Sequence, residues 1–212
     1  MTPLLTGIGL AAAAGWNAWV AVLFFNGIYR LLPQEFPGPT AAFLSSPLIL
    51  QLAVALFLAE FIVNKIPVVD HLWELGQTPL RPIVGGLLAV AASSGLTPIG
   101  QILTGVGGAA ATLAAHLVKS TTRLTTTAAT RGLTRVALSL AEDLIALILA
   151  VLVFFVPVFA GILLGAIAIL LLTHRQAVWR AIRVLFFQLQ HPRRALRDAT
   201  RAAPEPTPTA GP

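Results

Sequence analysis

The sequence predicts an all-α fold, a polytopic transmembrane helical bundle of about six spans. Of the 212 residues, 57% are hydrophobic and only 10% are charged, whereas soluble domains carry about 25% charged residues. The apolar residues come in blocks long enough to cross a bilayer, and not in the stripes of a water-facing helix. Cysteine is absent from the sequence, which excludes disulfides and thiolate metal sites. Composition therefore favours lipid over water as the main solvent.

Residues 4–32 are the first apolar block. The block exceeds the roughly 20 residues that one span needs, so we expect it to tilt or to break near Gly15. It lacks the basic n-region and short apolar core of a cleavable signal peptide, so we expect it to be retained as the first span. Proline, glycine and paired serines predict a loop over residues 33–46, and residues 47–66 are the second span.

The middle of the chain combines polar connectors with an apolar stretch that fits two geometries. Residues 64–81 hold several charges between two prolines, which predicts a short interfacial helix. Residues 82–118 are apolar and rich in glycine and alanine, with a break at residues 93–98. They fit either two spans, the first of them short, or a re-entrant helical hairpin that returns to the same face. Residues 119–135 follow as a polar, threonine-rich connector.

The last apolar block, residues 136–173 with Pro157 near the middle, predicts a hairpin of two spans that completes a transmembrane domain over residues 1–173. Apolar residues then recur at helical spacing, which predicts a basic amphipathic helix over residues 174–201 on the cytoplasmic membrane surface. Residues 202–212 are mostly Pro, Ala and Thr and are expected to be disordered. The tail residues expected to contact anionic lipid headgroups are Arg175, Arg180, Arg183, Arg193 and Arg194.

The positive charges lie almost entirely on one side of this topology. With six spans, all but one of the 14 Lys and Arg residues fall on the side of the termini, and Arg30 is the exception. The positive-inside rule then places both termini in the cytoplasm and predicts a multi-pass membrane protein. The net charge of +6 reflects topology, so we expect no nucleic acid as a partner.

Two short motifs occur twice in the chain. Residues 5–9 recur at residues 103–107, and residues 56–60 recur at residues 138–142. Three spans in each half would make the halves a 3+3 inverted repeat, as in many secondary transporters. The two spacings differ, however, and short coincidences are common in a chain rich in Leu, Ala and Gly. Chance is therefore the competing explanation.

Ionisable residues within apolar spans are the strongest functional signal, because a charge in hydrocarbon costs about 2.5 to 3.5 kcal/mol unless it is paired or hydrated. Glu60 lies near the end of the second span, and Glu142 and Asp143 lie near the start of the fifth. The last two are about 100° apart on a helix and can face different environments. Such carboxylates suit proton or cation coupling, and pairing with a basic residue at the interface is the alternative.

Three basic residues share one helix face near these acids: His116, Lys119 and Arg123. They could neutralise Glu142 or Asp143, or receive an anionic headgroup or substrate. Ordinary anchoring by positive charge is the alternative. A single histidine without a defined ligand spacing does not predict a metal site, so we expect neither a metal nor a cofactor.

A second polar cluster supplies further candidates for the same site: Asn64, Lys65, Asp70 and Arg81. A solvated loop with ordinary salt bridges is the alternative for these residues. Asn17, beside two tryptophans, is expected to hydrogen-bond across the bundle in a packing role. Small residues allow close helix packing, within one chain or in a homodimer, at Gly85, Gly86, Gly161 and Gly165.

Several of these motifs together resemble a bacterial membrane family catalogued as domain of unknown function 4126. The resemblance covers roughly residues 4–172, and its most specific part is a Lys-Ile-Pro-x-x-Asp core. The threonine-rich residues 121–131 depart from the expected pattern. The motifs that carry the resemblance are Gly7-Ile8-Gly9, Asn17-Ala18-Trp19, Ala59-Glu60-Phe61, Asn64-Lys65-Ile66-Pro67, Val69-Asp70-His71, Arg81-Pro82, His116, Lys119, Arg123 and Ser139-Leu140-Ala141-Glu142-Asp143. The resemblance implies a protein of the bacterial cytoplasmic (inner) membrane, without an established activity.

Together these observations predict a small transporter or channel-like protein with a polar site in the cytoplasmic half of the bundle. It would carry a small solute or ion that the sequence does not identify. The alternative is a structural or accessory membrane subunit, or a lipid-organising protein, whose charges are satisfied internally. The chain contains no HExxH motif, phosphate-binding glycine loop or Ser/His/Asp order, so we expect no catalytic residues and no enzyme activity. A membrane-embedded enzyme ranks third.

Overall fold

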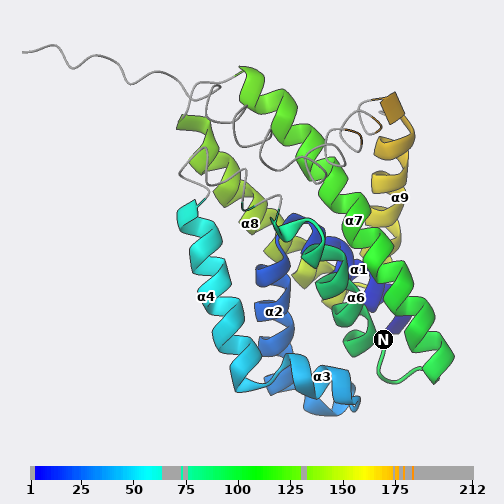
Figure 1. The fold of residues 1–212 in the computed structure, drawn as a ribbon. Coiled ribbons are helices and arrows are strands. Elements are labelled where there is room, and N and C mark those ends of the chain that lie inside the picture. Colours follow the sequence, from blue (N-terminus) through cyan, green and yellow to red (C-terminus); the bar gives the residue numbers. More distant parts are fainter. Residues whose placement is uncertain are drawn as a thin grey trace, which may run out of the picture.

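A computed structural model describes residues 3–63, 73, 76–129, 133–173, 175–176, 179 and 183, with side chains placed except at 121–136, 168 and 171. Within this part of the chain the fold is all-α, as predicted, with eight α-helices, one 3₁₀ helix and no strand. The longer helices run side by side as a bundle (Figure 1). The elements are α1 (Pro3–Trp16), α2 (Ala18–Leu31), η1 (Pro33–Glu35), α3 (Pro39–Leu44), α4 (Pro47–Val63), α6 (Leu80–Ala92), α7 (Pro98–Ala129), α8 (Leu133–Phe155) and α9 (Val158–Thr173).

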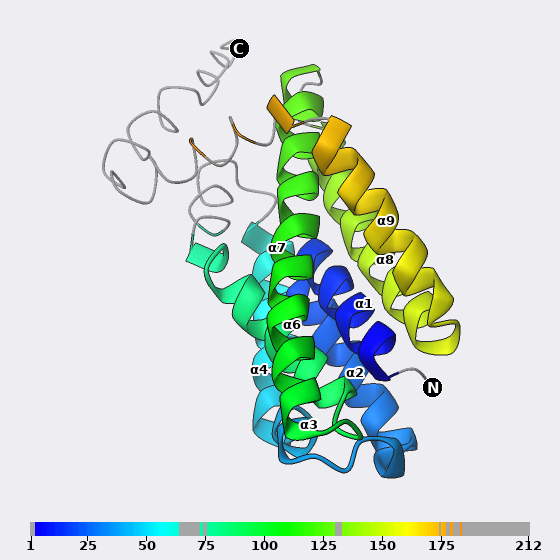
Figure 2. The ribbon, with the colours of Figure 1, turned by 90° about the vertical axis from the view of Figure 1, so that its right-hand side faces the viewer.

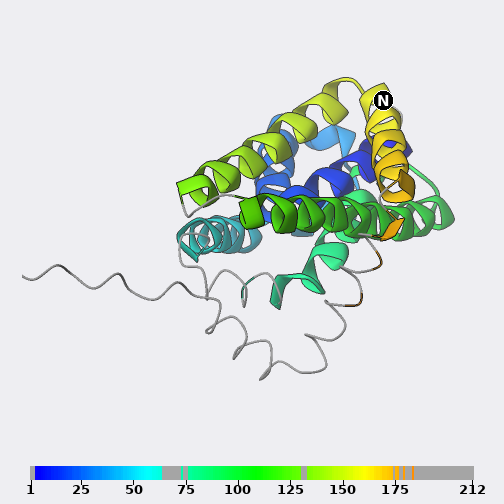
Figure 3. The ribbon, with the colours of Figure 1, turned by 90° about the horizontal axis from the view of Figure 1, so that it is seen from above.

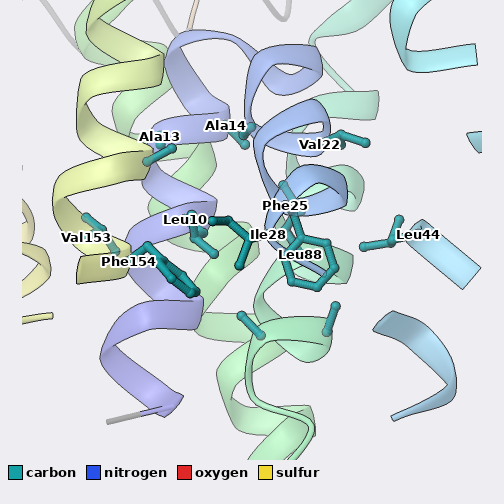
Figure 4. Packing of buried hydrophobic residues seen from close by; sticks show 14 of the residues in the cluster. Leu10, Ala13, Ala14, Val22, Phe25, Ile28, Leu44, Leu88, Val153 and Phe154 are labelled. Carbon is teal, nitrogen blue, oxygen red and sulfur yellow. The ribbon is translucent and has the colours of Figure 1, made fainter. Parts of the chain in front are cut away.

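The first apolar block folds into two helices, α1 and α2, so of the two expectations for residues 4–32, a tilt or a break near Gly15, the break is confirmed. The break falls at Asn17, close to the expected position. Its backbone is extended, and its side-chain Oδ1 accepts hydrogen bonds from the N–H groups of Trp19 and Val20 at 2.9 and 3.1 Å, which starts a new helix. The two helices run antiparallel and are joined at one end (Figures 1 and 4). Asn17 is the single residue between them, so it lies at the apex of the hairpin. Each has 14 residues and is about 21 Å long, shorter than the roughly 30 Å hydrocarbon layer.

Helix α1 is the centre of the bundle. It packs against α6, α7, α8 and α9 as well as α2, and from above it lies between α7 and α8 (Figure 3). Small residues permit this close approach. A Cβ on Gly7 would lie 2.7 Å from the carbonyl oxygen of Ala89, and a Cβ on Gly15 would lie 2.5 Å from that of Thr112. The end of α1 is therefore fixed against its neighbours.

The contacts of α1 with α7 also settle how the repeated motif is arranged. Gly7 lies against Thr104, and Gly15 lies against Ala115 and His116, so the two helices run in the same direction (Figure 2). The two copies of the motif, residues 5–9 and 103–107, thus pack as parallel neighbours. This differs from the inverted relation expected of a 3+3 repeat.

Residues 82–118 form a helical hairpin whose two arms are unequal. Helix α6 has 13 residues and α7 has 32, so a short first arm precedes a long second one, which are the relative lengths expected of the two-span alternative. Helix α7 also continues through most of the polar stretch that we expected to be a connector, residues 119–135. Threonine is only mildly unfavourable in a helix, so polarity alone does not end one.

Pro157 separates α8 from α9, as predicted, and gives the last hairpin. Within the described residues, two helical segments are long and apolar enough to cross a membrane, Pro98–Ser120 of α7 and Ala137–Phe155 of α8. In Figure 2 the start of α1 and the end of α9 lie at opposite ends of the bundle. The α1–α2 hairpin returns the chain to the end of the bundle where it began (Figure 1). Residues 1–2 and those after 183 lie outside the described part, so the prediction that both termini share one side stays a prediction.

The burial pattern of α4 is the reverse of that of a soluble helix. Among its 17 residues the buried ones are Ala53 and Glu60, while Leu48 and Ile62 are 71% and 60% exposed. An apolar core lies below the apex of the α1–α2 hairpin, where Leu10, Phe25 and Phe154 meet (Figure 4). The bundle therefore has apolar side chains both inside and outside, and carries a carboxylate on an inner face.

Gly15→Ala is expected to lower the free energy of unfolding by about 1 to 3 kcal/mol, the usual cost of overpacking. The added methyl group would meet backbone atoms of α7, which cannot move aside as a flexible side chain could. Thermal unfolding of the purified protein in detergent measures the effect. Gly161→Ala is the matched control, since a methyl group added there would meet no described atom within 4 Å, and it should leave the melting temperature nearly unchanged.

Candidate functional site: a buried charge cluster at a helix break

Four charged side chains from four helices meet inside the bundle. Glu60 of α4 and Arg81 of α6 form an ion pair at 3.2 Å, and Lys119 of α7 and Glu142 of α8 form another at 3.1 Å. All four residues are at most 3% exposed. Buried pairs recover the cost of desolvation only with good geometry and further hydrogen bonds. We call these four residues the charge cluster.

The C-terminal end of α1 supplies those further hydrogen bonds. Arg81 Nη1 donates to the carbonyl oxygens of Gly15 and Trp16 at 3.2 and 3.3 Å, and Lys119 Nζ donates to that of Trp16 at 2.8 Å. The last carbonyls of a helix have no partner within the helix and form the negative end of its dipole. Each cation of the charge cluster therefore joins one carboxylate to the end of α1.

Asn17 makes this arrangement possible. In an unbroken helix, the N–H groups of Trp19 and Val20 would donate to the carbonyls of Gly15 and Trp16. Asn17 Oδ1 accepts hydrogen bonds from both N–H groups instead. The two carbonyl oxygens are therefore available as acceptors for Arg81 and Lys119. Its Nδ2 also donates to Asp143 Oδ1 at 2.7 Å, so an acidic residue faces the positive N-terminal end of α2.

His116 of α7, with Gln77 and Thr78 just before α6, extends the polar region. His116 is buried, and its Nε2 lies 3.4 Å from Thr78 Oγ1. Gln77 can accept hydrogen bonds from the indole N–H groups of Trp73 and Trp19, at 2.5 and 3.1 Å, when its amide oxygen faces them. The apex of the α1–α2 hairpin is thus surrounded by polar groups at one depth of the bundle.

The structure brings together most of the predicted site residues that it describes. Lys119 pairs with Glu142, which confirms that the basic residues of α7 can neutralise this acid. Glu142 is buried and Asp143 is half-buried, so the two neighbouring acids have different environments, as predicted. Arg175 and Arg183 are exposed. Within the described residues no three His, Asp or Glu side chains are placed to hold a metal ion. The residues whose side chains lie outside the described part are Asn64, Lys65, Asp70, Arg123, Arg180, Arg193 and Arg194.

Sequence reasoning missed the carbonyl groups of Gly15 and Trp16, which hold both cations. It assigned Asn17 only to packing, although Asn17 does form the expected hydrogen bond across the bundle. The available signal was an asparagine directly after Gly-Trp in an apolar run, because asparagine is a strong helix N-cap. That signal predicts a helix start, and hence free carbonyls on the residues before it.

The predicted packing glycines divide into two pairs. Gly85 and Gly86 face α7: a Cβ on Gly85 would collide with the Thr112 side chain, and one on Gly86 would lie 3.2 Å from the Gly105 carbonyl oxygen. A Cβ on Gly161 or Gly165 of α9 would have no described atom within 4 Å. These two glycines take no part in packing among the described residues, and their role in a homodimer stays a prediction.

Asn17→Ala is expected to lower the free energy of unfolding by about 2 to 3 kcal/mol. It removes an N-cap, worth about 1 kcal/mol, and a hydrogen bond to a carboxylate, worth about 1.5 kcal/mol or more. Asn17→Ser separates the two effects, because serine keeps the cap but is too short to reach Asp143. Chemical denaturation of the purified protein measures both variants, and an equal loss in the two would contradict the capping role.

Comparison with known proteins identifies a family. The model of the family described as "Domain of unknown function (DUF4126)" matches residues 4–176, which include every member of the charge cluster and, except for Pro3, all of the helices from α1 to α9. No curated protein and no solved structure matches the chain. Since the match covers most of the 212 residues, and agrees with the motifs around Glu60 and Glu142, the chain belongs to the DUF4126 family.

Proposed function

We propose that the protein is a small membrane transporter or channel-like protein for an ion or small solute, and that the charge cluster is its polar site. One observation carries this proposal: two buried ion pairs are held at the end of α1, where the helix is interrupted at Asn17. Transporters commonly place their sites at such breaks, where helix ends and unpaired carbonyls face charged groups. Buried ionisable residues within apolar helices are costly and mark ion or proton pathways.

The burial pattern supports a membrane location. Helix α4 exposes leucine and isoleucine while it buries Glu60, an arrangement that suits hydrocarbon outside and a polar interior. The arginine-rich tail after α9 supports placing that end of the bundle, and with it the charge cluster, toward the cytoplasm of a bacterial inner membrane. The tail would then contact anionic headgroups. In this arrangement the α1–α2 hairpin would enter and leave the membrane on one side, which would place the start of α1 opposite the charge cluster.

A flux assay in proteoliposomes tests the proposal. Vesicles carry an entrapped pH-sensitive dye, and a potassium diffusion potential or a solute gradient is imposed while internal pH and vesicle volume are followed. Wild-type protein should accelerate at least one flux over empty vesicles, and Glu142→Gln should reduce it by about tenfold or more, since it removes one buried charge of the site. Glu35→Gln is the matched control, because Glu35 is exposed in η1.

A structural or accessory role is the second candidate, and a specific observation favours it. Arg81 and Lys119 both hold the end of α1, so the charges also serve the fold. If this were their whole role, charge-cluster variants would lose stability, while wild-type protein would give no flux above empty vesicles. That result would overturn the transport proposal.

A further inference from the structure

Glu60 carries an unused hydrogen-bond acceptor inside the charge cluster. The residue is 2% exposed, and its Oε1 accepts from Arg81 Nη2 at 3.2 Å. Its Oε2 is buried and has no hydrogen-bond donor in the part of the chain that the structure describes. A buried charged oxygen without a donor is costly. The folded protein therefore gains from a ligand that satisfies this oxygen.

The surroundings of Glu60 decide which ligand fits. A metal cation needs several oxygen ligands, and within the described residues no three acidic or histidine side chains are placed to supply them. A proton needs one oxygen and brings no coordination shell. Building on the proposed function, we propose that Glu60 is the proton-binding group of this site and takes up the proton on Oε2.

The contacts of Arg81 allow Glu60 to change its charge without disrupting the cluster. A proton from water bonds to Oε2, and the carboxylate becomes a neutral carboxylic acid. Arg81 then keeps its hydrogen bonds to the carbonyls of Gly15 and Trp16 and its place at the negative end of α1. The cation is therefore not left without a partner, and the ion pair can form and break while the end of α1 stays in place.

The other charged groups around this site are fixed by contacts of their own. Lys119 is held by Glu142 and by the Trp16 carbonyl, and Asp143 by Asn17. Helix α3 contributes no titratable side chain. The remaining titratable groups described on neighbouring helices are Tyr29 and Arg30 of α2 and His116 of α7. The Tyr29 ring lies near that of Phe25, Arg30 Nε donates to Asn26 Oδ1, and His116 lies beside Thr78. Of these groups, Glu60 has the buried charged oxygen that still lacks a donor.

Infrared difference spectroscopy on purified protein in lipid nanodiscs tests the proposal. Spectra are recorded across a pH series, and the carbonyl band of a protonated carboxylic acid is followed. We expect wild type to show a band that appears as pH falls, Glu60→Gln to lack it, and Glu35→Gln to keep it. Glu60→Asp should shift the frequency of this band, and this variant tests the proposal if Glu60→Gln does not fold. A band unchanged in both Glu60 variants would overturn the proposal.

The flux assay separates this inference from the proposed function. A titrating band that depends on Glu60, in a protein that carries no flux, would support the proton site and overturn transport. If Glu60→Gln transports at the full wild-type rate, Glu60 has no role in coupling the flux to protons. The proposed transport function would then still be tested by Glu142→Gln. Loss of both the band and at least tenfold of the flux in Glu60→Gln, with Glu35→Gln normal in both assays, is the expected result.

Discussion

Arg81→Leu is expected to lower the free energy of unfolding by about 3 to 5 kcal/mol, the usual cost of removing one partner from a buried ion pair. The effect is large because Arg81 serves two groups at once. Its loss leaves Glu60 buried without its ion-pair partner, and it removes the donor to the carbonyls of Gly15 and Trp16. Denaturant unfolding of the purified protein, or the fraction that remains monodisperse after heating, measures the loss.

A double-mutant cycle shows how much of that loss comes from Glu60. Replacing both members of a buried pair with apolar residues is often neutral, so Glu60→Leu in the Arg81→Leu background should recover part of the stability. The recovery should be incomplete, because the α1 carbonyls still lack their donor. Full recovery would show that the hydrogen bonds to α1 contribute nothing. No recovery would show that the ion pair contributes nothing.

The sequence predicted the helical class and most of the apolar blocks, because composition and block length are local properties of the chain. It did not predict that residues 4–32 fold as a hairpin. Tilting and breaking both shorten a long block, and the choice depends on packing against α7, where Gly15 meets Thr112 and Ala115. Those contacts are about 100 residues away in sequence, and no local pattern encodes them.

In the charge cluster, too, part of the arrangement could be predicted from sequence and part depends on packing between distant residues. The pairing of Lys119 with Glu142 was among the predicted outcomes, because both belonged to apolar helices near the same end. The partner of Glu60 was open, since Lys65 and Arg81 were both near in sequence, and only the position of α6 beside α1 brings Arg81 to it. The acceptors on α1 are backbone groups, which residue identity does not reveal.

Cysteine labelling should show whether both ends of the α1–α2 hairpin lie on the same side of the membrane. The chain has no native cysteine, so each introduced thiol is unique. Leu4→Cys near the start of α1 and Glu35→Cys in η1 are both exposed positions at the same end of the bundle (Figure 1). In a membrane, a hairpin that does not cross places both on one side. An impermeant maleimide should then label both from the same face of oriented vesicles.

Gln176→Cys provides the reference for the opposite face, because it follows α9 and is exposed. The expected pattern is that Leu4→Cys and Glu35→Cys react from one side and Gln176→Cys from the other. A single span over residues 4–32 would instead place Leu4→Cys with Gln176→Cys. That pattern would also move the charge cluster, because Gly15 and Trp16 could no longer lie at the apex of a hairpin. The labelling thus tests the arrangement on which every contact of Arg81 and Lys119 with α1 depends.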